Sequence, residues 1–173
     1  MKGLTFFRKE RRVKVNIEAK LKKMGLELPA PFKVPEGVRL PFSWVRVRGN
    51  LAFISGHGPQ DTDGSFALPL GKVGKDLTIE EGYASARKVA LSMLGTLKRE
   101  LGDLDRVAAW LRVFGMVNSA PGFDQQPRVI NGFSDLIIEL YGPERGGHAR
   151  SAVGMAELPF GFPVEIEAEI EIL

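Results

Sequence analysis

The sequence contains no cysteine and only two histidines, His57 and His148, among its 173 residues. Without cysteine there can be no disulfides, no thiolate metal ligands and no cysteine nucleophile. Neither histidine has a metal-ligand spacing to an acidic residue, so we expect no metal site. No apolar run reaches the roughly 18 residues needed to cross a bilayer, and the N-terminus lacks the apolar core of a signal peptide. These absences favour a cytoplasmic protein.

The basic residues are concentrated at the N-terminus. Residues 1–24 contain nine lysines and arginines and two glutamates, a charge of +7 within a total of +3, which leaves the remainder mildly acidic at −4. A nucleic-acid-binding surface would place basic residues on the folded body, interleaved with aromatic ones. We therefore expect no nucleic-acid partner, and we interpret residues 1–15 as a solvated tail.

The following residues predict a linker and then one domain. Residues 17–24 predict a short helix that stops at Gly25, and the prolines after it predict an extended linker. Nothing in this stretch indicates a second domain, and the chain is long enough to bury one sizeable core. The predicted division is a basic extension with a proline-rich linker over residues 1–40, and a domain over residues 41–173.

The C-terminal segment has the clearest pattern in the chain. Apolar and acidic residues alternate without a break over residues 164–172, which is typical of a β-strand with one buried and one polar face. Residues 159–163 read Pro-Phe-Gly-Phe-Pro and predict a turn, and residues 149–158 predict a preceding strand. We therefore expect a terminal hairpin that carries Arg150 on its first strand.

The residues alone leave two interpretations of Arg150. In the first, the hairpin places Arg150 opposite Glu169 and Glu171, where a cross-strand ion pair contributes roughly 0.2–1 kcal/mol. In the second, Arg150 lies in a cleft, and its planar guanidinium binds a ligand carboxylate through two hydrogen bonds.

The apolar periodicities together indicate an α+β fold. Strands are predicted at residues 43–48, 51–57, 107–117, 149–158 and 163–172. One long helix should begin at Thr78, which forms a capping box with Glu81, and end at Gly102. A second should run from about residue 125 to residue 141, capped by Asp124 and stopped by Gly142-Pro143.

These elements describe a single mixed β-sheet with two long helices on one face. The predicted strand at residues 107–117 and the stretch at residues 51–54 are nevertheless apolar on both parities. Since two helices cover only one face of such a sheet, the second apolar face predicts an oligomer interface.

Three separated motifs resemble those of the Rid family of reactive intermediate deaminases, also called the YjgF family. The closing signature is Ala149-Arg150-Ser151, then Leu158-Pro159, then Val164 to Ala168. The Gly49-Asn50-Leu51 and Ile54-Ser55-Gly56-His57-Gly58-Pro59 segments resemble the family's first strand pair, and Asn131 falls where the family usually has an asparagine. The resemblance extends from about residue 41 to residue 173.

The resemblance implies a chorismate-mutase-like fold, a homotrimer, and ligand clefts between subunits. It implies that Arg150 binds the carboxylate of a small 2-imino or enamine acid and that backbone groups near Gly56 add polar contacts. Glu165 would help to place a water molecule, and Asn131 would line the cleft. The implied reaction is hydrolysis of the imine to a 2-keto acid and ammonia, without a cofactor.

Three substrate-binding positions depart from the family pattern. Phe42 stands where the family has a site tyrosine, Ala152 where it has a cysteine, and His57 where it has a glutamine. The sequence around Arg150 resembles that of a less characterised branch of the family. Structural interpretations stay open beside the functional ones: Glu165 as a solvated strand residue, His57 as a neutral histidine packed at a turn, and Asn131 as a polar helix residue.

Three functions compete at this point. The first is hydrolytic deamination of reactive imino acids, and the second is a non-catalytic trimer that binds a small carboxylate metabolite. The third is an endoribonuclease, an activity reported for some relatives. It ranks last because the sequence offers no histidine pair placed for acid–base catalysis and no basic face outside the tail.

Overall fold

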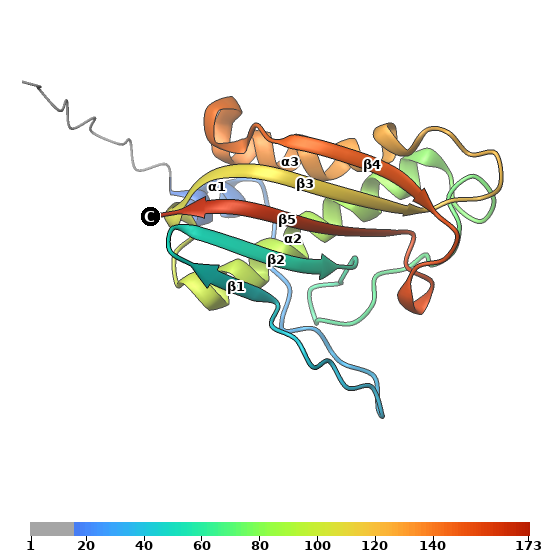
Figure 1. Ribbon diagram of the computed structural model, residues 1–173, viewed down its shortest axis with the longest axis horizontal. Coiled ribbons are helices and arrows are strands. Elements are labelled where there is room, and N and C mark those ends of the chain that lie inside the picture. Colours follow the sequence, from blue (N-terminus) through green and yellow to red (C-terminus); the bar gives the residue numbers. More distant parts are fainter. Residues whose placement is uncertain (1–15) are drawn as a thin grey trace, which may run out of the picture.

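The computed structural model describes residues 16–173, so the expected solvated tail at residues 1–15 lies outside the described part (Figure 1). The described chain forms five strands, three α-helices and two 3₁₀ turns. The strands are β1 (Val45–Arg48), β2 (Leu51–His57), β3 (Val107–Asn118), β4 (Ala149–Met155) and β5 (Val164–Ile172). The helices are α1 (Ile17–Lys23), α2 (Ile79–Leu101) and α3 (Gln126–Gly146). None of these helices is long and apolar enough to cross a membrane.

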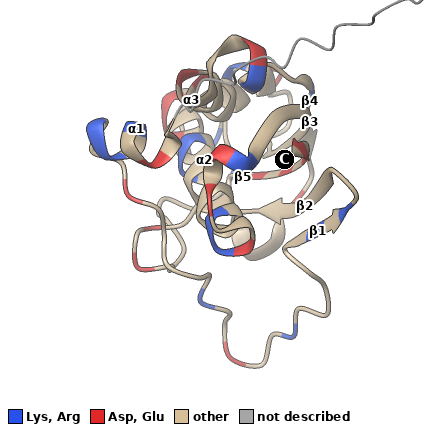
Figure 2. Cartoon of the chain, turned by 90° about the vertical axis from the view of Figure 1, so that its left-hand side faces the viewer, with Lys and Arg blue, Asp and Glu red and all other residues tan. Residues whose placement is uncertain are grey.

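The strands form one mixed sheet, as predicted, in the order β1-β2-β5-β3-β4. Only β3 and β4 run parallel, and α3 is the crossover between them. The helices α2 and α3 lie side by side against one face of the sheet, which leaves the other face open (Figures 1 and 2). The α+β class and the single mixed sheet are therefore confirmed.

The strand β5 explains which face is covered. Its apolar residues, from Val164 to Ile172, are all buried, whereas the four glutamates between them are only half-buried. The apolar side lies in one core with the inner faces of α2 and α3, and the glutamates line the open face. The strict alternation therefore gives β5 one buried apolar face and one polar face, as expected for a half-buried strand.

The prediction of a terminal hairpin is wrong. The strands β4 and β5 are not neighbours, because β3 lies between them and pairs with β4 on one side and β5 on the other. The turn at Pro159–Gly161 carries the chain across the end of β3 rather than back along β4. Alternation defines the faces of a strand but not the identity of its neighbour, so the sequence pattern could not exclude this arrangement.

Arg150 consequently makes no cross-strand pair with the glutamates of β5. Glu169 instead pairs with Arg112 on β3, at 3.2 Å from Oε1 to Nη1. Glu171 accepts a hydrogen bond from Asn50 Nδ2 at 2.9 Å. The first interpretation of Arg150 is therefore wrong.

The helix boundaries follow local chemistry with one exception. Thr78 and Glu81 form the predicted capping box, and α2 ends at Gly102 with a left-handed φ of 80°. The exception is Asp124, which does not cap α3: the N-cap is Gln125, and Asp124 Oδ1 accepts a hydrogen bond from Gln125 Nε2. Gly142 has a non-helical conformation where the predicted stop lies, although one further turn follows it.

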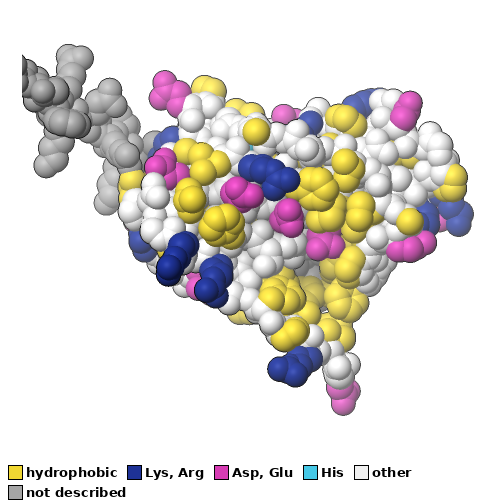
Figure 3. All heavy atoms as spheres, viewed as in Figure 1, with side chains coloured by type: hydrophobic (Ala, Val, Ile, Leu, Met, Phe, Trp, Pro, Cys, Tyr) yellow, Lys and Arg dark blue, Asp and Glu magenta, His cyan; other side chains and the backbone are white. Residues whose placement is uncertain are grey.

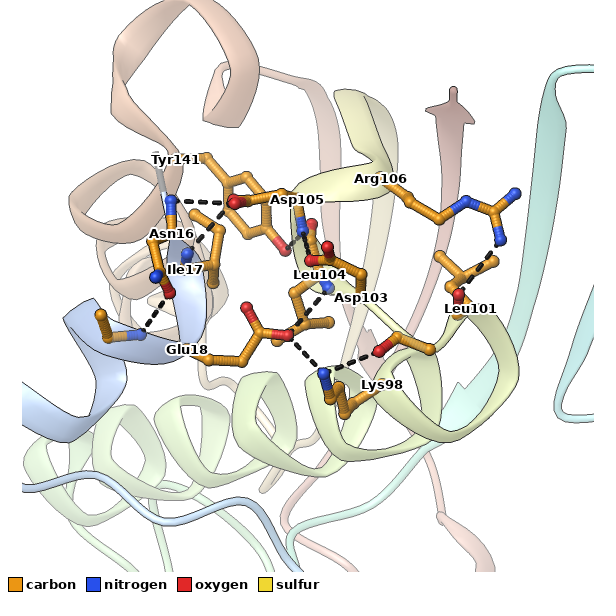
Figure 4. A network of polar contacts seen from close by, with 12 residues as sticks. Asn16, Ile17, Glu18, Lys98, Leu101, Asp103, Leu104, Asp105, Arg106 and Tyr141 are labelled. Atoms are coloured by element: carbon orange, nitrogen blue, oxygen red, sulfur yellow. Dashed lines mark hydrogen bonds and ion pairs between the residues drawn. The ribbon is translucent and has the colours of Figure 1, made fainter. Parts of the chain in front are cut away.

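The short helix α1 is attached to the domain by a reciprocal polar contact (Figure 4). The Asp105 carboxylate accepts hydrogen bonds from the Asn16 and Ile17 amides at the start of α1. Glu18 of α1 in return accepts from the Leu104 amide at 3.1 Å and pairs with Lys98 of α2 at 2.6 Å. With Ile17 and Leu21 fully buried in the same core as the sheet, the core extends into the segment that the sequence assigned to the N-terminal extension.

The contact between α2 and α3 depends on one glycine, Gly132. A Cβ on Gly132 of α3 would overlap the Tyr83 carbonyl oxygen of α2. A Cβ on Gly82 of α2 would meet only Val129 and Val73 side-chain atoms, the nearest at 3.1 Å. Backbone cannot move aside as a side chain can, so the close approach at Gly132 fixes the crossing of the two helices.

We predict that Gly132→Ala lowers the free energy of unfolding by about 1–3 kcal/mol, the usual range for overpacking. Gly82→Ala is the matched control, since the gain in helix propensity of about 1 kcal/mol offsets its milder crowding. Urea denaturation of both variants measures the difference. Equal stabilities would contradict the close approach of the helices.

Candidate functional site

Arg150 lies on β4 and points toward the helices. In the parallel ladder it stands beside Val113 of β3, whose side chain is fully buried on the helix face. Its guanidinium Nη1 donates to Asn131 Oδ1 at 3.0 Å and to Ser134 Oγ at 2.9 Å, both on α3. Nη2 reaches the Pro127 carbonyl at 3.4 Å. The structure thus brings Arg150 and Asn131 together.

The acceptors around Arg150 are all neutral. An arginine has five N–H donors, of which two sit on each Nη and one on Nε. Both Nη1 hydrogens are used, and Arg150 Nε makes no hydrogen bond within residues 16–173. Nε and Nη2 form one edge of the guanidinium, the edge that binds a carboxylate with two parallel hydrogen bonds. Burial lowers the pKa of Arg150, and Asp135 opposes that shift.

Glu165 and Gly56 form a second cluster, on the open face of the sheet. Glu165 stands between the buried residues Val164 and Ile166 on β5, so its side chain faces away from the helices. A Cβ on Gly56 of β2 would overlap Glu165 Oε1, so a side chain at this position would displace the carboxyl from its present place. Partial burial, and then the charge of Glu167, raises the pKa of Glu165. A carboxyl with a raised pKa is suited to take and return a proton near neutral pH.

Phe42 lies beside a hollow on the same open face. Its ring meets Trp44 edge-on at 5.1 Å between centroids, and half of Phe42 is exposed. The hollow has a volume of about 550 Å³, and its lining includes Phe42, Arg46, Phe53, Arg112 and Glu167. Acidic side chains run across this face beside apolar and basic ones (Figure 3).

His57 is a buried neutral histidine rather than a base. It is only 3% exposed, and burial lowers its pKa to about 4. Its Nδ1 lies 2.7 Å from the Ser55 carbonyl, which can only accept, so Nδ1 carries the hydrogen. Nε2 then accepts from the Thr96 hydroxyl at 3.0 Å. Ala152, beside Gly115 in the ladder, packs partly buried against the core and offers no reactive group.

The candidate residues therefore form two groups within one chain. Arg150, Asn131 and Ala152 lie between β4 and α3, whereas Glu165 and Gly56 lie on the opposite face of the sheet. Within residues 16–173, no group of three or more histidines and carboxylates is close enough to hold a metal ion.

Two residues near Arg150, Ser134 and His148, were not among the predicted site residues. The spacing of each in the sequence could have placed it near a predicted one. Ser134 follows Asn131 by three residues on a predicted helix, which places both on one face. His148 precedes Arg150 by two residues, which places both on one side of an extended chain.

Comparison with known proteins agrees with this fold. The model of the family described as "YjgF/chorismate_mutase-like, putative endoribonuclease" matches residues 18–161. Protein TCP17 of Trypanosoma cruzi is 40% identical over 156 residues, which cover 90% of this chain and 94% of TCP17. Its name states no activity.

Two solved structures are also similar. A protein of unknown function from Agrobacterium tumefaciens has a TM-score of 0.80 and 37% identity, covering 91% of this chain and 92% of its own. A Shewanella oneidensis protein with the same endoribonuclease designation has a TM-score of 0.81 and 28% identity, covering 91% and 99%.

The single mixed sheet with α2 and α3 on one face defines an α+β protein, in which Arg150 lies between β4 and α3 with neutral hydrogen-bond acceptors. The chain belongs to the Rid/YjgF family, whose YjgF/chorismate-mutase-like model matches most of its length.

We predict that His57 makes the fold sensitive to acid. The unfolded chain binds a proton at His57 below about pH 6.5, whereas the folded chain does so only below about pH 4. Stability therefore rises with pH across this window, by about 3 kcal/mol for such a shift. In His57→Gln this part of the pH dependence should vanish, as measured by urea denaturation at several pH values. Parallel curves for the two proteins would contradict the assignment.

Proposed function

We propose that the protein hydrolyses reactive 2-imino and enamine acids to 2-keto acids and ammonia, with Arg150 holding the substrate carboxylate. The observation that carries the proposal is the Arg150 guanidinium. Asn131 and Ser134 occupy its Nη1, and no carboxylate of residues 16–173 pairs with it. A half-buried positive charge held only by neutral groups keeps its attraction for an anion.

The reaction needs little from the protein beyond positioning. An iminium carbon is already electrophilic, so a fixed substrate and an oriented water molecule give most of the rate. Water adds to that carbon, a proton moves to nitrogen, and the C–N bond breaks to release ammonia and leave the keto group. Glu165, with its raised pKa, would accept a proton from the water and return one to the nitrogen.

A second copy of the chain would complete the site. Arg150 and Asn131 lie on the helix side of the sheet, whereas Gly56 and Glu165 lie on its open side, so one chain offers two halves of a cleft. The open face also exposes apolar side chains, of which Leu51, Phe53 and Leu111 are 37–45% exposed. Burial of this face in a homotrimer, with clefts between the subunits, would join the Arg150 half of one chain to the Glu165 half of the next.

Binding without turnover is the second candidate, and a specific observation favours it. The carboxylate-binding arginine is present, but Phe42, Ala152 and the buried His57 supply no hydroxyl, thiol or basic group to the cleft. Such a protein would bind small carboxylates as a regulator or reservoir. The endoribonuclease function ranks below both because His57 is buried and neutral, and His148 is hydrogen-bonded within the fold.

We predict that Arg150→Ala abolishes turnover of imines generated in situ by an amino-acid oxidase. It should weaken binding of 2-ketobutyrate or benzoate about 10- to 100-fold, since a hydrogen bond to a charged group contributes about 1.5–3 kcal/mol. The melting temperature should stay nearly unchanged, because the guanidinium leaves no partner charge behind.

Arg106→Ala is the matched control, since Arg106 also donates to main-chain carbonyls, those of Leu101 and Leu173. Lost affinity in a wild type that never turns over imines would select the binding function. A wild type that binds neither acid would contradict the role of Arg150.

We further predict that the protein is a trimer at micromolar concentration, because Leu51, Phe53 and Leu111 on the open face of the sheet would otherwise stay in water. Light scattering measures the mass. In Phe53→Glu, which places a charge on this face beside the glutamates of β5, the trimer should dissociate. A stable wild-type monomer would contradict both the interface and the shared cleft.

A further inference from the structure

A hydrogen-bonded chain leads from the backbone to Arg150. His148 Nδ1 lies 2.7 Å from the Gly146 carbonyl oxygen, and His148 Nε2 lies 2.9 Å from Ser134 Oγ. The same Ser134 oxygen lies 2.9 Å from Arg150 Nη1. Ser134 is only 7% exposed, so water does not compete freely for these bonds. Three residues from α3, from the loop after it and from β4 are thus joined at one hydroxyl.

The direction of every hydrogen bond in this chain is fixed. The Gly146 carbonyl can only accept, so His148 Nδ1 carries the hydrogen and Nε2 is the acceptor. Ser134 must therefore donate its single hydrogen to Nε2. Its oxygen lone pairs are then turned toward the arginine, where they accept from Nη1. The histidine determines the orientation of the hydroxyl, and the hydroxyl determines the position of the guanidinium.

The surroundings of His148 favour its neutral imidazole, the form whose Nε2 can accept a hydrogen bond. Burial, and then the positive charge of Arg150, lower the pKa of His148. Asp135 of α3 is exposed and accepts a hydrogen bond from Tyr83 of α2 at 2.9 Å. The Phe133 ring meets the imidazole edge-on, at 6.4 Å between centroids. A carboxylate in place of Ser134 would also have fixed Arg150, but it would have neutralised the charge that attracts an anion.

We propose that Ser134 and His148 are positioning residues that hold the Arg150 guanidinium with its Nε–Nη2 edge presented to an anionic ligand. The proposal rests on the proposed function for its ligand, a small carboxylate. The positioning itself is a property of the free protein. A side chain fixed before binding loses less conformational entropy on binding, which increases affinity.

The experiment combines two readouts on the full chain. The first is the order of the Arg150 Nε–H bond from ¹⁵N relaxation in the free protein, with the signal assigned from its loss in Arg150→Lys. The second is the affinity for benzoate from calorimetry. In Ser134→Ala we expect a clear fall in the Arg150 order parameter and a three- to tenfold weaker affinity, whereas Ser134→Thr retains both.

A second variant and a control distinguish loss of positioning from a general folding defect. His148→Phe keeps a ring at this position but removes the acceptor, so it should loosen Arg150 in the same way. Ser92→Ala deletes a buried helical hydroxyl on α2 that bonds only the Lys88 carbonyl, and it should change neither readout.

The outcomes separate the two proposals. If wild type binds no benzoate but Ser134→Ala still frees Arg150, the proposed function fails and the positioning role stands. If wild type binds benzoate and both variants leave the Arg150 order and the affinity unchanged, the positioning role is overturned and the function stands.

Discussion

The structure depends on the position of β5 in the sheet. This strand has one fully apolar face and one row of glutamates, and it lies between β2 and β3. Its apolar face directs α2 and α3 to one side, since only that side offers them a dry surface. Its glutamates lie on the other side, which the helices do not cover. The two groups of candidate residues lie on different sides of this sheet. Glu165 is on the open face of β5, and Arg150 is on the helix side of β4, which lies on the other side of β3.

The second organising feature is a positive charge that the fold positions without neutralising it. A strand arginine is ordinarily paired with a carboxylate, as Arg112 is with Glu169. Arg150 is held instead by an amide, a hydroxyl and a carbonyl. Two arginines on adjacent strands therefore differ in their partners, and the one without a carboxylate partner is the one that we propose binds a ligand.

Much of this could be predicted from the sequence because it is governed by local rules. The capping box at Thr78, the stop at Gly102 and the alternation of β5 each depend on residues close together in the chain. The pairing of β4 could not be predicted in this way. A strand's partner is set by packing across the whole sheet, and the crossover through α3 outweighed the short turn at Pro159–Gly161.

The site shows the same division between motif and environment. Arg150 and Asn131 were identified from motifs, and the structure brings them together. A neutral, packed His57 was one of the interpretations of the sequence, but its partner Thr96 and the contact of Ser134 with Arg150 were not predictable, because each depends on how α2 and α3 pack against the sheet. The placement of Arg150 and Glu165 on opposite faces also required the sheet order, and this placement is the reason why we propose a cleft completed by a second copy.

A crystal structure of the protein with 2-ketobutyrate or benzoate tests this account most directly. We expect the ligand carboxylate to bind the Nε–Nη2 edge of Arg150, with Asn131 beside it and with Gly56 and Glu165 of a neighbouring copy closing the cleft. A carboxylate bound elsewhere, such as in the hollow between Phe42 and Arg112, with Arg150 unoccupied, would contradict it.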